Sequence, residues 1–295
     1  MPDFRLGRLP AQIPAGLRDL TYYSAGPLPK APASVAIPPV EAWGLDGNGP
    51  DPSCTVAPEG VGDCGVAALN HYAMAAAADT GEAETFPDAD QVVDFYLQFT
   101  GGQDSGVVLS QFLAYVRQNG FCGHTVTAYA PVAVSDVPTL TFVIDAYDAA
   151  YAGITVSQGM MDAAEGPGPW TWTLESVQGA KLGGHAIVLV AYDSNWLYGI
   201  TWGQVVRIAY PAWHQMGDEA WALLSGEVSS AGTDGHGINR AALLADLSGL
   251  DMPAPAPAPA PPGLLGKFAG FIREVEASGH EDVAELLAWF EKKGV

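Results

Sequence analysis

Two short motifs hold the side chains of this chain that are best suited to chemistry. Cys64 lies within Gly-Asp-Cys-Gly at the start of an alanine-rich run, and His185 follows two glycines at the start of an apolar run. A thiol at a helix N-terminus is a favoured nucleophile, because the exposed N–H groups and the helix dipole stabilise the thiolate. A histidine beside the thiol in the fold can take its proton. The motifs therefore predict a thiol nucleophile, although the carboxylate of Asp63 opposes thiolate formation.

The spacing of apolar and turn residues predicts the elements that carry these two side chains. Cys64 is expected near the start of a helix capped by Asp63, and His185 at the start of a strand. Helices are predicted over residues 63–78, 88–99, 108–119, 143–150 and 211–216. Strands are predicted over residues 125–129, 151–157, 170–174, 185–192, 195–201, 205–210 and 220–224, with a loop over 159–169. Helices followed by strands predict an α+β domain with an antiparallel sheet.

Composition divides the chain into an arm, a domain, a linker and a hairpin. These parts are expected at residues 1–45, 46–250, 251–262 and 263–295. Prolines keep the arm extended, and the alternating Pro-Ala run of the linker favours a stiff polyproline helix. The arm is expected to wrap its own domain or a neighbouring subunit, or to serve as a pro-segment. The two short amphipathic helices of the hairpin need a surface to dock on, because they cannot bury their apolar faces alone.

Charge and hydropathy exclude several classes of partner. The formal net charge is −21, and residues 31–262 hold four basic residues against 25 acidic ones. Such a body repels phosphate backbones, so no nucleic acid partner is expected. The sequence has no apolar run of signal-peptide length at its start and no window of about 18 apolar residues, so we expect no signal peptide, no membrane partner and a location in the cytoplasm of the producing cell.

The remaining cysteines, histidines and acidic residues give weaker signals. Three cysteines do not make a disulfide framework in 295 residues, and a pairing of Cys54 with Cys122 stays open. The other histidines lack metal-ligand spacing, and no phosphate-binding or dinucleotide motif occurs, so no metal or cofactor is expected. Asp218 and Glu219 follow a predicted short helix and are expected to face solvent.

Three segments together resemble the papain-like cysteine peptidase superfamily. They are Gly-Asp-Cys at 62–64, Gly-Gly-His-Ala-Ile-Val-Leu-Val-Ala-Tyr at 183–192 and Ile-Thr-Trp-Gly at 200–203. The layout is also similar to a set of phage and prophage proteins of this fold. The resemblance covers roughly residues 5–250 and implies a papain-like α+β fold. Its N-terminal half would be helical and its C-terminal half an antiparallel sheet, flanked by the extended arm and the C-terminal helical hairpin.

The resemblance also implies roles for individual residues. Cys64 matches the nucleophile and His185 the general base. The family orients this histidine with an Asn or Asp, and the matching place here is Ile200 or Thr201. Threonine can accept a hydrogen bond but carries no charge to stabilise an imidazolium. Trp202 matches the tryptophan that would shield the histidine from water.

The oxyanion donor is the second departure from the family pattern. The glutamine that usually precedes the nucleophile by six residues is replaced by Pro58, which offers no donor. Asn48 could serve instead if residues 50–62 form an inserted loop. A missing oxyanion donor costs about 2.7–4 kcal/mol of transition-state stabilisation.

Two functions remain open on the sequence alone. The first is a cysteine hydrolase that acts on amide or isopeptide bonds through Cys64 and His185. The second is a catalytically inactive virion component, such as a capsid-decorating or minor head or tail protein. In the second case residues 1–45 and 263–295 would attach the domain to a protein partner, a virion shell or a second copy of the chain.

Overall fold

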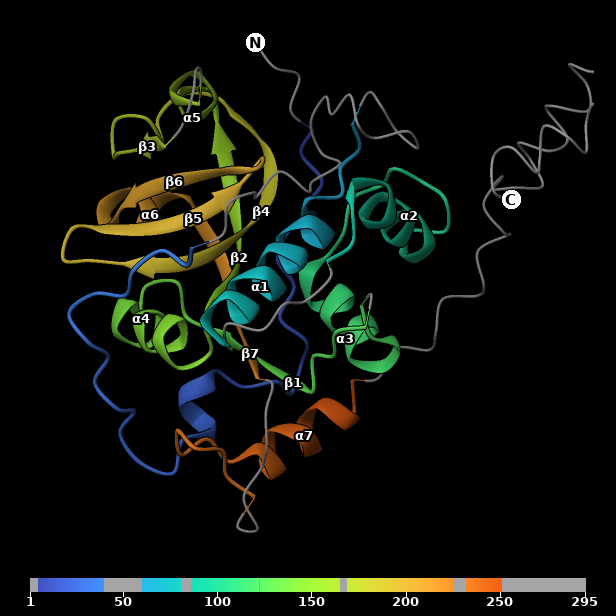
Figure 1. The fold of residues 1–295 in the computed structure, drawn as a ribbon, viewed down its shortest axis with the longest axis vertical. Coiled ribbons are helices and arrows are strands. Elements are labelled where there is room, and N and C mark those ends of the chain that lie inside the picture. Colours follow the sequence, from blue (N-terminus) through green and yellow to red (C-terminus); the bar gives the residue numbers. More distant parts are fainter. Residues whose placement is uncertain are drawn as a thin grey trace, which may run out of the picture.

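A computed structural model of the protein describes residues 5–39, 60–80, 86–121, 123–164, 169–224 and 232–250. The predicted linker and hairpin, together with Asn48, Cys54 and Cys122, lie outside these ranges. Figure 1 shows a sheet on one side of the molecule, helices α2 and α3 on the other, and helix α1 between them. No helix among the described residues is long and apolar enough to cross a membrane.

After an extended N-terminal segment, most of the helices come before most of the strands. The helices are η1 (Leu20–Tyr23, a 3-10 turn), α1 (Cys64–Thr80), α2 (Ala89–Phe99), α3 (Leu109–Asn119), α4 (Val137–Ala146), α5 (Gln158–Ala163), α6 (Tyr210–Met216) and α7 (Arg240–Ser248). The strands are β1 (Ala128–Val132), β2 (Ala150–Ser157), β3 (Trp170–Trp172), β4 (Lys181–Tyr192), β5 (Trp196–Thr201), β6 (Gln204–Ala209) and β7 (Gly217–Leu224).

The strands form one sheet in the order β1-β7-β2-β4-β5-β6-β3. Neighbouring strands run antiparallel, except that β3 pairs with β6 in parallel. Strand β4 lies at the centre and is buried from His185 to its end, which explains why its sequence is a continuous apolar run rather than an alternating one. The strand that carries His185 is therefore among the most enclosed parts of the molecule.

Helix α1 packs directly on β4 and also contacts β2 and β5. Its first nine residues are all buried, which fits a helix of mostly small and apolar residues enclosed on every side. Gly65 permits the close approach, because a Cβ atom there would lie 2.4 Å from Cγ2 of Val107. The hydroxyl of Tyr151 on β2 donates to the carbonyl of Gly65 at 2.7 Å and fixes the first turn of the helix to the sheet.

Helices α2 and α3 form the other side of the core. A capping box at Asp88 and Gln91 starts α2, and Gly120, with φ of 74°, ends α3. Their shared interior is an aromatic cluster in which Phe95 and Phe99 make edge-to-face contacts with Phe112 and Tyr115. These helices support the loop that carries Val107, which flanks the first turn of α1.

The described part of the N-terminal arm wraps its own domain. Arg8 forms bridges with Val107 and Gly184, and further along Val35 pairs with Tyr192 of β4. Between these points the Tyr23 hydroxyl donates to Asp246 of α7 at 2.8 Å. Figure 1 shows this blue segment passing from the region of α1 and β4, around the end of the molecule near β1 and α7, to the side of α4.

Three helices differ from the sequence predictions. Helix α4 begins at Val137, six residues before the predicted start at 143, because the Asp136 side chain caps it and a proline occupies its first turn. Residues 150–157 then form a complete strand. Helix α5 occupies the start of the predicted 159–169 loop, where Ser157 accepts the N–H of Met160. Helix α7 was not predicted and is capped by Asn239.

Candidate active site

Cys64 is the first residue of α1 and is almost fully enclosed. Its exposed fraction is 1%, and its Sγ accepts the backbone N–H of Ala186 at 3.4 Å. Because Ala186 directly follows His185 in β4, this hydrogen bond brings the first turn of α1 to the histidine. The helix start and the strand start, 121 residues apart in sequence, are therefore neighbours in the fold.

The imidazole of His185 is held by the strand that follows it. Its Nε2 lies 2.7 Å from Oγ1 of Thr201 at the end of β5. The side chain is buried, with 1% exposure, and Nδ1 has no hydrogen-bond partner among the described residues. Of the two alternatives at the orienting place, Thr201 contacts the histidine, whereas Ile200 is a fully buried core residue.

Trp202 closes the site over the imidazole. Its ring stacks on His185 with centroids 4.3 Å apart and planes 20° apart. The backbone of Trp202 has φ of 46°, a left-handed conformation that is unfavourable for a bulky residue and is enforced here by the turn between β5 and β6. The tight turn thus directs the indole onto the histidine, where it excludes water.

Residues 6–9 of the arm, here called the covering segment, lie across the thiol. Leu9 donates its N–H to Val107 at 2.8 Å, and Val107 donates to the carbonyl of Gly7 at 2.7 Å. On the other side Arg8 donates its N–H to the carbonyl of Gly184 at 3.1 Å. A Cβ atom at Gly7 would lie 1.6 Å from the carbonyl oxygen of Gly62, so only glycine fits there.

Burial sets the protonation of both side chains in this closed arrangement. Burial raises the pKa of Cys64 to about 12; the N–H groups of Ala186 and Gly7 oppose the shift, and the Asp63 carboxylate adds to it. Burial also lowers the pKa of His185 to about 3, and the positive charge of Arg8 contributes. At neutral pH the closed site therefore holds a thiol and a neutral imidazole.

Arg8 also contributes a buried ion pair that sequence reasoning missed. Its guanidinium contacts the carboxylate of Asp218 and lies 3.1 Å from Oε1 of Glu219. The prediction that these acids face solvent is wrong for Glu219, whose side chain is 1% exposed, and holds for Asp218, which is an exposed residue. Strand β7 begins at Gly217, and its alternation turns Glu219 inward beside Gly153 of β2.

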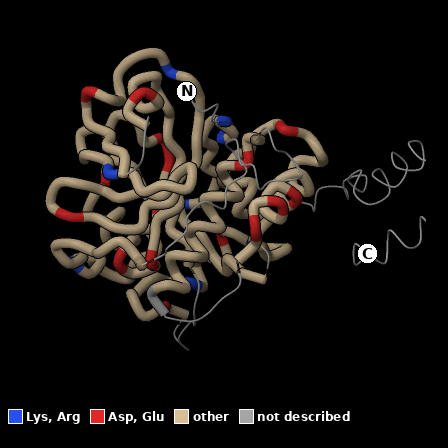
Figure 2. The backbone as a smooth tube through the Cα atoms, turned by 45° about the horizontal axis from the view of Figure 1, so that its top comes forward, with Lys and Arg blue, Asp and Glu red and all other residues tan. Residues whose placement is uncertain are grey.

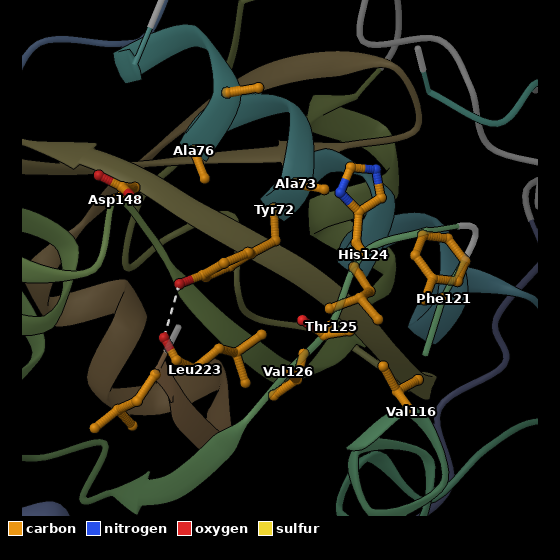
Figure 3. Close-up of a pocket in the computed structure, with 13 residues that line it drawn as sticks. Tyr72, Ala73, Ala76, Val116, Phe121, His124, Thr125, Val126, Asp148 and Leu223 are labelled. Atoms are coloured by element: carbon orange, nitrogen blue, oxygen red, sulfur yellow. Dashed lines mark hydrogen bonds between the residues drawn. The ribbon is translucent and has the colours of Figure 1, made fainter. Parts of the chain in front are cut away.

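A separate cavity of about 330 Å³ lies beside the later turns of α1 and holds none of the predicted site residues. Figure 3 shows Tyr72, His124 and Val116 around it, with the Tyr72 hydroxyl donating to the carbonyl of Leu223 at 3.0 Å. The described residues contain no group of three His, Cys, Asp or Glu side chains placed to hold a metal ion.

The fold is that of the papain-like cysteine proteases. The chain superposes on xylellain, a cysteine protease from Xylella fastidiosa, with a TM-score of 0.57 and 14% identity over 76% of this chain and 97% of xylellain. Digestive procathepsin L 3 of Tenebrio molitor larval midgut matches with a TM-score of 0.43 and 12% identity, over 74% of this chain and 75% of its own. The proform of the ragweed pollen cysteine protease Amb a 11 matches with a TM-score of 0.42 and 15% identity, over 73% of this chain and 72% of its own.

No protein-family model and no curated protein matches the chain. At this low identity the structural likeness shows the fold alone, and it confirms the predicted papain-like α+β class.

Proposed function

We propose that this protein is a cysteine hydrolase that cleaves amide or isopeptide bonds with Cys64 as the nucleophile. The contact that carries the proposal is the hydrogen bond from the N–H of Ala186 to Sγ of Cys64. It places a thiol at a helix N-terminus beside a histidine whose ring is fixed by Thr201 and Trp202. A nucleophile, a base and a group that orients the base are the parts that covalent catalysis requires.

The proposed reaction uses the histidine nitrogen that Thr201 leaves free. Nδ1 of His185 takes the thiol proton while Sγ attacks the carbonyl carbon, and the imidazolium then protonates the departing amine as the C–N bond breaks. Water, deprotonated by the same nitrogen, hydrolyses the thioester and restores the thiol. The tetrahedral oxyanion would be stabilised by the backbone N–H of Cys64, at the helix start, and by the side chain of Asn48, the donor predicted from the sequence.

The covering segment makes the proposed enzyme latent. Its three backbone hydrogen bonds hold residues 6–9 over a thiol whose pKa is about 12, so neither a substrate nor a thiolate is accommodated while it stays. Hydrolysis requires this segment to leave, after which water reaches Cys64 and the cost of forming the ion pair with His185 falls. This supports the pro-segment role among the alternatives left open for the arm.

The test compares thiol reactivity with the segment in place and displaced. Gly7→Leu cannot fit against Gly62 and should displace the segment, whereas Gly26→Ala is a matched arm variant, since a Cβ there meets no atom within 4 Å. Alkylation by iodoacetamide at Cys64, located by peptide mapping, should be slow in the parent and in Gly26→Ala. In Gly7→Leu it should be faster below pH 7 than for a free thiol of pKa about 8.5.

Loss of this fast reaction in Gly7→Leu/His185→Ala would support the catalytic pair. If Cys64 of Gly7→Leu reacts no faster than a free thiol, and His185→Ala changes nothing, the hydrolase proposal is wrong. Hydrolysis of a fluorescent protein substrate by Gly7→Leu, compared with Gly7→Leu/Cys64→Ala, then tests turnover directly.

The alternative is a catalytically inactive structural protein. The neutral threonine at the orienting place and the sealed thiol favour it, since both weaken catalysis. A phage setting, in which the protein would process virion precursors, cleave cell-wall peptides or decorate a capsid, is supported by the sequence resemblance and by the appended segments. Deletion of residues 253–295 should abolish particle association if that segment is the anchor, and unchanged association would contradict the anchor.

A further inference from the structure

The strongest unexplained feature near the thiol is the set of groups around the Arg8 side chain. Its guanidinium contacts Asp218, lies 3.1 Å from Oε1 of Glu219 and donates to the carbonyl of Ile154 at 3.1 Å. Three acceptors thus converge on one cation from β2 and β7. A planar guanidinium with five N–H groups can satisfy three such acceptors together, which a compact ammonium does less well.

Two glycines leave the space that the Arg8 side chain occupies. A Cβ atom at Gly153 would lie 2.6 Å from Cδ of Arg8 and 2.8 Å from Cγ of Glu219. A Cβ atom at Gly184 would lie 3.0 Å from both Nε and Nη2 of Arg8. Glycine in β2 and in β4 therefore leaves the space that the arginine fills, although either position in a strand would ordinarily favour a larger residue.

The acids in the pocket are also held by neighbours other than Arg8. The indole N–H of Trp221 donates to Oε2 of Glu219 at 2.9 Å, which leaves Oε1 directed at Arg8. Thr155 similarly donates to Asp218 at 2.7 Å. A buried carboxylate with no cation is costly, so an empty pocket would strongly favour a new positive group.

The pocket adjoins the thiol. Gly153 lies in β2 between Glu219 of β7 and Ala186 of β4, and Ala186 is the residue whose N–H meets Sγ of Cys64. Along the covering segment, the residue before Arg8 is Gly7, whose N–H also reaches that sulfur. An open cleft of about 530 Å³ lined by Arg8 and Asp218 continues outward from the pocket and offers a path for entry.

We propose that this pocket, formed by Gly153, Ile154, Asp218, Glu219 and Trp221, is a specificity site for an arginine side chain of a polypeptide substrate. Arg8 is the occupant that the chain supplies to itself in the closed state. The ligand class is a peptide with arginine next to a small residue at the thiol, as in Gly7-Arg8. Binding of such a peptide does not require the proposed hydrolase activity. Only its cleavage rests on that proposed function.

The experiment measures binding without catalysis. The full chain with Gly7→Leu, Arg8→Ala and Cys64→Ala has a displaced segment, an empty pocket and no nucleophile. Calorimetry compares the peptide acetyl-Leu-Gly-Arg-Leu-amide with versions that carry lysine or citrulline in place of arginine. Citrulline keeps the shape of arginine and removes its charge. If the triple variant does not fold, Gly7→Ala replaces Gly7→Leu in it, because a Cβ atom alone already meets the carbonyl of Gly62.

The arginine peptide should bind at least about tenfold more tightly than the citrulline peptide, with lysine between them. Adding Glu219→Gln should bring the arginine and citrulline affinities together. Equal affinities without Glu219→Gln, or no binding of the arginine peptide to either protein, would overturn the proposal. Because this variant lacks Cys64, its peptide binding is independent of the alkylation experiment. Arginine-selective binding together with an unreactive Cys64 would support the pocket and contradict the hydrolase. A reactive Cys64 without arginine-selective binding would support the hydrolase and contradict the pocket.

Discussion

The indole of Trp202 lies stacked on the imidazole of His185, with ring centroids 4.3 Å apart. With Thr201 at Nε2, this contact leaves the histidine enclosed on one face and fixed at one nitrogen. Burial of the imidazole disfavours the charged imidazolium and is the main reason that the pKa of His185 is lowered to about 3, with the positive charge of Arg8 adding to the shift. The protonation of this one side chain therefore couples the site to the stability of the whole domain.

The first prediction is a loss of stability in mild acid that depends on His185. The unfolded chain takes up a proton near pH 6.5 and the folded chain only near pH 3, so stability is lost as pH falls through this window. Between pH 7.5 and pH 5 the free energy of unfolding should fall by about 2 kcal/mol more in the parent than in His185→Gln. Urea unfolding at both pH values measures the difference. Equal losses in the two proteins would show that His185 is not buried neutral.

The second prediction concerns alkaline solution and Cys64. Its pKa is raised to about 12, so the unfolded chain loses the thiol proton first and stability falls as pH rises above about 9. Between pH 8 and pH 10 the parent should lose about 1.4 kcal/mol more than Cys64→Ser, whose hydroxyl does not ionise. The same unfolding measurement applies, and buried tyrosines contribute equally to both proteins. If the parent and Cys64→Ser lose the same stability between pH 8 and pH 10, the thiol is already open to water.

The third prediction concerns the group that orients the histidine. In the Gly7→Leu background, Thr201→Asn should increase the rate of Cys64 alkylation at pH 6.5 by about tenfold, because an amide oxygen is a fixed acceptor for the Nε2 proton. Thr201→Val keeps the shape of threonine, removes the acceptor and should decrease the rate. Rates that are unchanged in both variants would mean that the contact at 2.7 Å is structural only.

The fourth prediction concerns the ion pair beneath the covering segment. Arg8→Ala leaves Glu219 buried without its cation and should destabilise the chain by about 3–5 kcal/mol. Burial already raises the pKa of Glu219, so the destabilisation should be larger at pH 7 than at pH 4, where protonation removes the unpaired charge. Adding Glu219→Gln should recover much of the loss at pH 7. No recovery would mean that Arg8 acts through packing of its stem alone.

The sequence predicted those parts of the site that depend on local pattern. The helix at Cys64 and the strand at His185 are each encoded within a few residues, and the Thr-Trp-Gly segment that follows lies one strand further along. Figure 2 shows acidic residues at many separate places along the described backbone, with fewer basic residues among them.

What could not be predicted depends on contacts between distant segments. Arg8 meets Glu219 across 211 positions, and nothing near either residue in the sequence indicates the other. Glu219 is buried because it lies opposite Gly153 of β2, and the residues around Glu219 in the sequence do not indicate this partner. The start of α4 differs from the prediction for another reason. Its apolar run is also compatible with a later start, and the cap at Asp136 determines where the helix begins.

The close contact of Gly7 with Gly62 makes the stability of the closed state sensitive to the residue at position 7. If the covering segment opens as proposed, the ratio of covered to uncovered molecules follows the free energy of closing it, at about 1.4 kcal/mol for each tenfold change. Because a single added methyl group at position 7 would meet the Gly62 backbone, the smallest possible substitution acts on this equilibrium. In the proposed enzyme, position 7 would thus control how much of the thiol is exposed at rest without itself taking part in the chemistry.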